Sequence, residues 1–206
     1  YEHSSKATVP YTWGTIGLTY NEEEIKKRMA DAPVNSLDML FKPELAAKFA
    51  DCGISMIDSP DEALAVVLNY LGRDPRSGKA EDLAAASELL MKLRPYIRKF
   101  QSQPVTDLVN GNLCLSLGYS GDMTQAQRAA DAAGKAVTFG YHIPREGTTV
   151  WMDTMAIPVD ARHPEYAYAF INFVMRPQNM AAITNLTGYP TANAKARPQV
   201  EASLRD

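Results

Sequence analysis

The sequence has no long apolar run and no strong charge, and each absence narrows the classes of protein to consider. No run approaches the roughly 20 apolar residues that a membrane-spanning helix needs, so we do not expect a membrane-embedded protein. The net charge of −3, from 21 basic and 24 acidic residues, gives no reason to expect nucleic acid as a partner. The first residues, YEHSSKATVPYTWG, also lack the basic start and apolar core of a signal peptide.

Familiar motifs of catalysis and metal binding are missing as well. There is no phosphate-binding loop ending in Gly-Lys-Ser/Thr, no pair of metal-binding cysteines, and no His-x-x-x-His on a helix. The stretch GYSGD (118–122) differs from the Gly-x-Ser-x-Gly elbow of hydrolases because its second glycine comes one residue early. We therefore expect no cofactor and no metal, and binding without turnover is favoured over an enzyme.

The chain has two cysteines, Cys52 and Cys114, which are compatible with two buried thiols or with one disulfide. A bond between them would close a loop of about 60 residues and stabilise the fold by about 4 kcal/mol in the chain-entropy model. Such a bond would persist only in an oxidising compartment. The residues alone leave both alternatives open.

Strand and helix patterns alternate along the chain and predict an α/β fold built on an open sheet. Strands are expected at 15–21, 54–59, 113–120, 136–144 and 147–158. Helices are expected at 21–32, 36–53, 58–72, 79–100 with a break at Pro95, 104–112, 121–134 and 164–190. In such folds ligands bind beyond the carboxyl ends of strands, where loops lead into helices.

Carboxylates and aromatic residues occupy positions of this kind. Glu62 lies in the first turn of a helix that Ser59 is expected to cap, so it either stabilises the helix dipole or binds a ligand. Asp122 begins a helix directly after a strand and follows Tyr119. Asp122 is therefore either an N-terminal capping residue or a ligand contact, and Tyr119 is either a core residue or a ligand contact.

Asp153 stands alone in GTTVWMDTMAIP (147–158), a segment with the composition of a half-buried strand. We expect it to be buried, where a carboxylate needs a partner. Trp151 and Tyr189 are either packing residues or ligand contacts. Together these acids and aromatics suit a cationic, partly aliphatic ligand, because carboxylates bind ammonium groups and aromatic faces cover methylenes.

Several segments resemble the periplasmic polyamine-binding proteins, the putrescine/spermidine receptors of bacterial ABC importers. They include, in the same order and spacing, VPYTWGTIGLTYN (9–21), LVNGNLCLSLGYSGD (108–122), IPREGTTVWMDTMAIP (143–158) and GYPTANAKA (188–196). The resemblance implies a type II periplasmic-binding-protein fold whose two lobes close on a polyamine held in an interlobe cleft. It also implies a periplasmic location and the permease subunits of an ABC transporter as partners.

The resemblance assigns roles to individual residues. The family's ligand-contacting positions fall on Glu62, Tyr119, Asp122, Trp151, Asp153 and Tyr189. Tryptophan is usual at the position of Tyr119, so ligand size and the choice between putrescine and spermidine stay open. Cys52 and Cys114 match cysteines that form a disulfide in putrescine-type members, which favours the bonded alternative.

A complete receptor of this family is longer than 206 residues, so the resemblance implies a fragment. By this interpretation residues 15–143 form a complete second lobe, while 1–14 and 144–206 form the hinge crossing and a partial first lobe. A fragment of this kind would hold part of a site and bind ligand weakly or not at all. The alternative is a signalling or interaction module that uses the receptor fold without polyamine transport.

Overall fold

The computed structural model describes residues 7–205; residues 1–6, which belong to the predicted partial first lobe, and residue 206 lie outside the described part. The chain divides into two compact units. Unit 2 is Thr15–Thr149, and unit 1 combines the residues up to Gly14 with those from Val150 onward. The assignment of these units to the two lobes, with a boundary at 143, stays a prediction.

The strands form a single mixed sheet. They are β1 (Thr8–Asn21), β2 (Ile54–Met56), β3 (Ile97–Phe100), β4 (Leu115–Tyr119), β5 (Phe139–His142) and β6 (Val150–Ala156). Five of them are ordered β3-β2-β4-β1-β5, and β6 also pairs with β1. Strand β2 runs parallel to β3 and β4, whereas β1 runs antiparallel to β4 and β5. The sheet and its intervening helices confirm the predicted α/β class.

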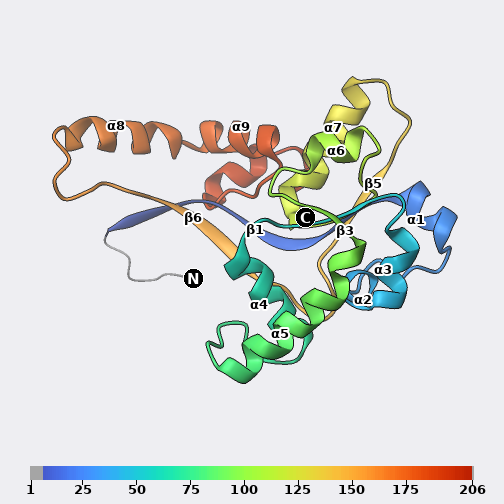
Figure 1. Cartoon of the computed structure of the whole chain (residues 1–206). Helices are drawn as coiled ribbons and strands as arrows, with labels where there is room; N and C mark the ends of the chain where they lie inside the picture. Colours follow the sequence, from blue (N-terminus) through green and yellow to red (C-terminus); the bar gives the residue numbers. More distant parts are fainter. Residues whose placement is uncertain (1–6, 206) are drawn as a thin grey trace. The chain divides into compact units, whose positions relative to one another are not determined.

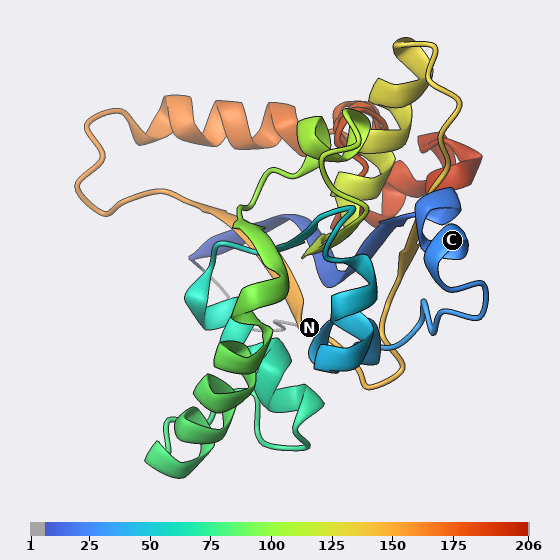
Figure 2. The same cartoon turned by 45° about the vertical axis from the view of Figure 1, so that its right-hand side comes forward.

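The helices of unit 2 cover both faces of its sheet. They are α1 (Glu22–Arg28), α2 (Asp38–Phe41), α3 (Pro43–Phe49), α4 (Pro60–Tyr70), α5 (Ala80–Leu93), η1 (Arg94–Tyr96), α6 (Val105–Val109) and α7 (Ser120–Ala132). Figures 1 and 2 show α6 and α7 on one face, with α2, α3, α4 and α5 on the other. This two-sided cover explains why β2 is buried at all three of its residues and β4 at four of its five.

The centre of unit 2 is closely packed. Ile54, Leu115 and Leu117 on the paired strands β2 and β4 are completely buried. Next to this pair, Cys52 and Cys114 form a disulfide whose Cα atoms lie 5.5 Å apart. The structure therefore confirms the bonded alternative for the two cysteines.

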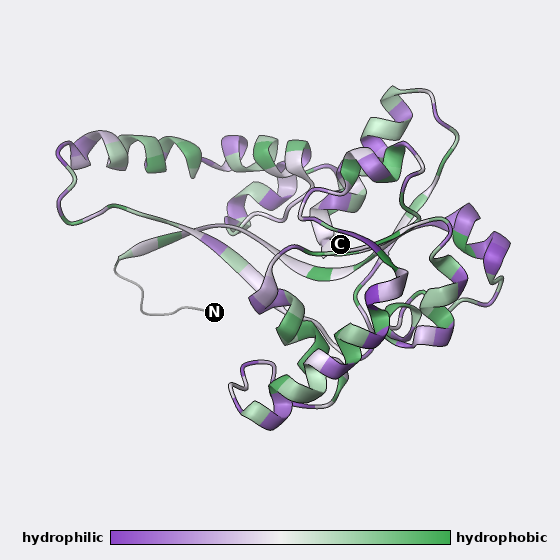
Figure 3. Ribbon diagram, viewed as in Figure 1, coloured by the Kyte–Doolittle hydropathy of each residue, from purple (hydrophilic) through white to green (hydrophobic). Residues whose placement is uncertain are grey.

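Unit 1 has a smaller core, formed mainly by α9 (Pro177–Thr187) and the 3-10 helix η2 (Ala194–Gln199). Its buried members are Val174, Met180, Ala181, Ala196 and Val200. Helix α8 (Pro164–Val174) precedes α9 along the chain, and a short 3-10 helix, η3 (Ala202–Leu204), follows η2. Figure 3 shows hydrophobic residues along much of α8, although its tyrosines and phenylalanines are exposed.

Three local predictions are wrong in instructive ways. The helix expected over 79–100 ends at Leu93, and Ile97–Phe100 is instead the edge strand β3, because Pro95 cannot continue the helical hydrogen bonds and β2 supplies a partner. Ser59 occupies the N-cap position of α4, but its side chain makes no capping hydrogen bond. The first strand begins at Thr8, seven residues before the expected start.

Candidate functional site

Glu62 and Tyr119 meet within unit 2. Helix α4 begins at Pro60, which fixes Glu62 in the first turn, where the positive end of the helix dipole favours a carboxylate. Tyr119 ends β4 and immediately precedes α7. Its hydroxyl donates a hydrogen bond to Glu62 Oε2 at 2.7 Å, so an acid and an aromatic ring 57 residues apart in sequence form one pair.

Asp122 lies beside this pair in the first turn of α7 and is buried. Its Oδ2 accepts a hydrogen bond from the backbone N–H of Tyr119 at 3.2 Å. The side chain lies close over Gly118, since a Cβ atom at Gly118 would be only 3.0 Å from Oδ2. Asp122 therefore stabilises the start of α7, as one alternative expected, and its role as a ligand contact stays a prediction.

The other three expected residues lie in unit 1. The indole ring of Trp151 contacts Tyr189 edge-on, with ring centroids 5.1 Å apart and an interplanar angle of 74°. Such an arrangement is favourable for an aromatic pair. The backbone N–H of Tyr189 donates to Thr187 Oγ1 at 3.3 Å, and the next residue, Pro190, accepts a hydrogen bond from the backbone N–H of Trp13 on β1 at 3.1 Å.

The expectation that Asp153 is buried is wrong. Strand β6 is mostly exposed, and Asp153 is exposed with it, so this carboxylate has no large desolvation cost to offset. Its Oδ2 accepts a hydrogen bond from Thr12 Oγ1 at 3.3 Å. The partner that the sequence required is thus a hydroxyl 141 residues away on β1, and the carboxylate remains open to a cation.

The structure divides the six expected residues into two sets of acids and aromatics. Unit 2 brings together Glu62, Tyr119 and Asp122. In unit 1 Trp151 contacts Tyr189, and Asp153 lies two residues further along β6. Each set combines carboxylate oxygens, which accept charge-assisted hydrogen bonds from ammonium groups, with ring faces that can cover methylene groups. Within residues 7–205, no group of three or more His, Cys, Asp or Glu side chains could hold a metal ion.

Tyr141 is a neighbour of this site that the sequence analysis did not single out. Its hydroxyl is 2.7 Å from Thr15 Oγ1, and its side chain lies over Gly17. Burial raises the pKa of Tyr141 to about 12; the bond with Thr15 opposes this rise, and the negative charge of Asp122 adds to it. No motif surrounds Tyr141, and its place over Gly17 follows from the pairing of β5 with β1, two strands far apart in sequence.

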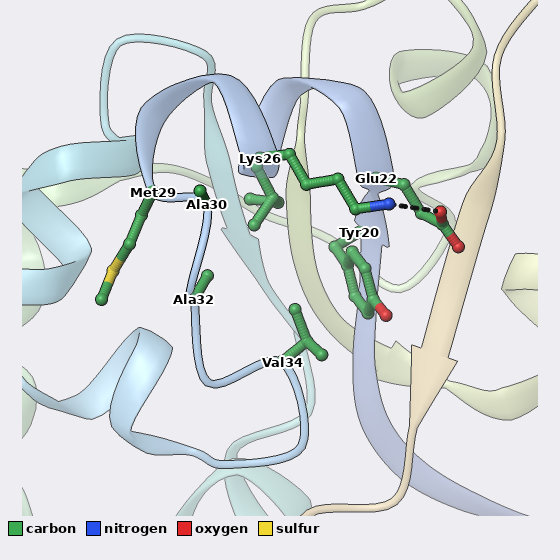
Figure 4. A pocket seen from close by; sticks show the side chains of 8 residues that line it. Tyr20, Glu22, Lys26, Met29, Ala30, Ala32 and Val34 are labelled. Carbon is green, nitrogen blue, oxygen red and sulfur yellow. Dashed lines mark hydrogen bonds and ion pairs between the residues drawn. The ribbon is translucent and has the colours of Figure 1, made fainter.

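A separate cavity of about 180 Å³ lies in unit 2 where β1 leads into α1 (Figure 4). Its lining includes Tyr20 and the apolar side chains of Ile25, Met29 and Val34. At its rim the ammonium of Lys26 is 3.3 Å from a carboxylate oxygen of Glu22. None of the six expected residues lines this cavity, and the carboxylate of Glu22 at its rim is already paired with Lys26.

Comparison with known proteins gives a consistent result. The family model described as "Bacterial extracellular solute-binding protein" matches residues 4–203. The putrescine-binding periplasmic protein SpuD of Pseudomonas aeruginosa is 46% identical over 200 residues, which are 96% of this chain and 54% of that protein. The putrescine-binding periplasmic protein PotF of Escherichia coli is 42% identical, with coverage of 100% and 56%. The chain therefore spans about half the length of these relatives.

Solved structures agree on the fold. The spermidine/putrescine ABC transporter substrate-binding protein PotD of Streptococcus pneumoniae superposes with a TM-score of 0.76 at 28% identity, over 98% of this chain and 58% of that one. SpuD and PotF are named as putrescine-binding proteins and PotD as the substrate-binding protein of an ABC transporter, and none of the three is named as an enzyme. The helices between residues 7 and 205 include none with the length and apolarity required to cross a membrane. The predicted periplasmic-binding-protein fold is confirmed, and the chain belongs to the bacterial extracellular solute-binding protein family.

Proposed function

We propose that this chain is the ligand-binding part of a periplasmic polyamine receptor that delivers its ligand to the permease subunits of an ABC transporter. The hydrogen-bonded pair of Glu62 and Tyr119 is the observation that carries the proposal, because it places a carboxylate beside an aromatic ring in a protein without an evident catalytic set. The names of the relatives at 42–46% identity, both putrescine-binding, support a diamine as the ligand.

Each set of residues has a defined part in this proposal. Glu62, Asp122 and Asp153 neutralise ammonium groups, and their hydrogen bonds are strengthened by the opposite charges. Tyr119, Trp151 and Tyr189 cover the aliphatic stem and add cation–π attraction. Binding is the whole function in this proposal, and the protein makes and breaks no covalent bond.

The test is an NMR titration of the 206-residue chain with putrescine into the millimolar range, where weak binding is still measurable. Asp153→Asn keeps the shape of the side chain and removes its charge, so we expect affinity to fall about tenfold. Asp160→Asn is the matched control, because Asp160 is an exposed acid of the same unit outside the proposed set. Undiminished affinity in Asp153→Asn would contradict the role of Asp153, and absence of any binding up to the millimolar range would contradict the proposal that this chain by itself binds a polyamine.

A further inference from the structure

Two glycines face each other across the central strands of unit 2. Gly17 on β1 and Gly118 on β4 are directly opposite in the antiparallel register, so the positions of their missing Cβ atoms lie on the same face of the sheet. Without side chains, these residues leave a shallow space on that face. Two other side chains occupy it, one over each glycine.

Tyr141 occupies the space over Gly17, and Asp122 occupies the space over Gly118. A Cβ atom at Gly17 would lie 2.6 Å from both Cζ and Oη of Tyr141, and one at Gly118 would lie 3.0 Å from Asp122 Oδ2. Because the two glycines are paired, the phenol ring and the carboxylate are neighbours on the same face. The effect of the Asp122 charge on the pKa of Tyr141 agrees with this proximity.

Hydrogen bonds fix the ring in this place. The Tyr141 hydroxyl is bonded to Thr15 Oγ1, and the backbone N–H of Thr15 donates to Ser120 Oγ at 3.4 Å. Ser120 is the first residue of α7, the helix that carries Asp122. The ring is therefore tied to the same helix start as the carboxylate, and since the pKa of Tyr141 is about 12 its hydroxyl stays neutral at physiological pH.

We propose that Tyr141 is a specificity-determining residue that restricts the ammonium group held by Asp122 to a primary amine at the end of a chain. A primary ammonium carries carbon on one side only, whereas a secondary ammonium carries carbon on two sides and needs additional room. The Tyr141 ring fills the space beside Asp122 into which the second carbon chain would extend. This inference rests on the proposed function and adds a selection for putrescine over N,N′-dimethylputrescine, a diamine whose two ends are both secondary amines.

The test compares Tyr141→Ala with Tyr141→Phe by NMR titration of the 206-residue chain. Putrescine and N,N′-dimethylputrescine are the probes, and circular dichroism checks that each variant is folded. Tyr141→Ala opens the space beside Asp122, so we expect the affinity for N,N′-dimethylputrescine relative to putrescine to rise about tenfold. Tyr141→Phe keeps the ring and loses only the hydroxyl, so we expect the ratios to change less than about threefold.

If Tyr141→Ala does not fold, Tyr141→Leu takes its place. Leucine retains part of the buried volume and is still shorter than the tyrosine ring beside Asp122. Unchanged affinity ratios in the folded variant, with putrescine still bound, would overturn the role of Tyr141 and leave the proposed function intact. A similar rise in both the truncated and the phenylalanine variant would overturn the steric argument. Absence of putrescine binding by the unaltered chain would overturn the proposal that this chain by itself binds a polyamine, and this inference with it.

Discussion

Strands β4 and β6 both consist mainly of apolar and aromatic residues, but their surroundings are very different. Strand β4, in unit 2, is buried at four of its five residues, whereas β6, in unit 1, is exposed at five of seven. Helix α8 extends the contrast, since Tyr166, Phe170 and Phe173 on it are all more than half exposed. Apolar composition thus indicates that a segment can be buried. Whether it is buried depends on the elements that pack on it.

The disulfide gives the largest test of this comparison, because both of its cysteines lie in unit 2 and no cysteine lies in unit 1. Replacing both cysteines by serine should lower the free energy of unfolding of unit 2 by about 4 kcal/mol, since a loop of about 60 residues is no longer closed in the unfolded chain. Both tryptophans, Trp13 and Trp151, lie in unit 1, so tryptophan fluorescence reports on unit 1 while far-UV circular dichroism follows mainly unit 2.

Urea titrations with these two probes should therefore separate in the serine variant, with the circular dichroism midpoint shifted to lower urea and the fluorescence midpoint unchanged. Equal shifts of both midpoints would mean that the units unfold as one cooperative body. That result would contradict the expected difference in stability between unit 1 and unit 2.

A pair of truncations tests burial itself. Leu117→Ala in β4 removes a completely buried side chain and should lower the free energy of unfolding by about 3 kcal/mol, from lost transfer energy and the cavity left behind. Phe170→Ala in α8 removes a larger side chain that is 62% exposed, and should cost less than about 0.5 kcal/mol. Urea unfolding measures both values, and comparable losses would show that α8 is packed in solution.

A smaller effect is expected at Glu146, which joins the 145–147 loop to the start of α2. Its carboxylate accepts hydrogen bonds from the Ser36 hydroxyl and, at 3.1 Å, from the backbone N–H of Leu37. Glu146→Gln should lower the free energy of unfolding of unit 2 by about 1.5 kcal/mol, because these bonds lose their charged acceptor. Glu88→Gln is the matched control, since Glu88 is exposed on α5 and only pairs with Lys92.

The stability of unit 2 should also depend on pH through the carboxylate of Glu146. Burial alone would raise the pKa of Glu146, but the hydrogen bonds from Ser36 and Leu37 outweigh it and hold the pKa below 4.5. A lowered pKa in the folded state means that this stabilisation is complete above the unfolded pKa and is lost as the pH falls through the folded value. Unit 2 of the Gln variant should therefore lose less stability than the unaltered chain below about pH 4.5, and identical acid profiles would contradict this assignment.

Local sequence signals predicted most helices and strands of this chain. Pro60, Pro164 and Pro177 each stand at the first position of a helix, and Gly188 ends α9 with a positive φ of 75°. Ile97–Phe100 was missed, because a four-residue edge strand with two basic residues resembles the end of the preceding amphipathic helix. Only pairing with β2, more than 40 residues earlier, makes it a strand.

The site shows the same division between local and non-local information. Glu62 and Asp122 could be interpreted as ligand contacts because each lies in the first turn of a helix that follows a strand. The hydroxyl of Thr12 beside Asp153, and the ring of Tyr141 beside Asp122, depend on contacts between residues far apart in sequence. The exposure of Asp153 could not be predicted from the sequence of β6, because that sequence does not show which elements cover the strand.

The Cys52–Cys114 bond also bears on the order in which the chain can fold. Residues 53–113 include β2, α4, α5 and β3, so the contacts between β2 and β4 join distant parts of the chain. In the oxidised chain the two ends of this long loop are already together before folding begins, which removes much of the loop-closure cost that slows folds with non-local pairing. Refolding from urea should consequently be faster for the oxidised chain than for the reduced one.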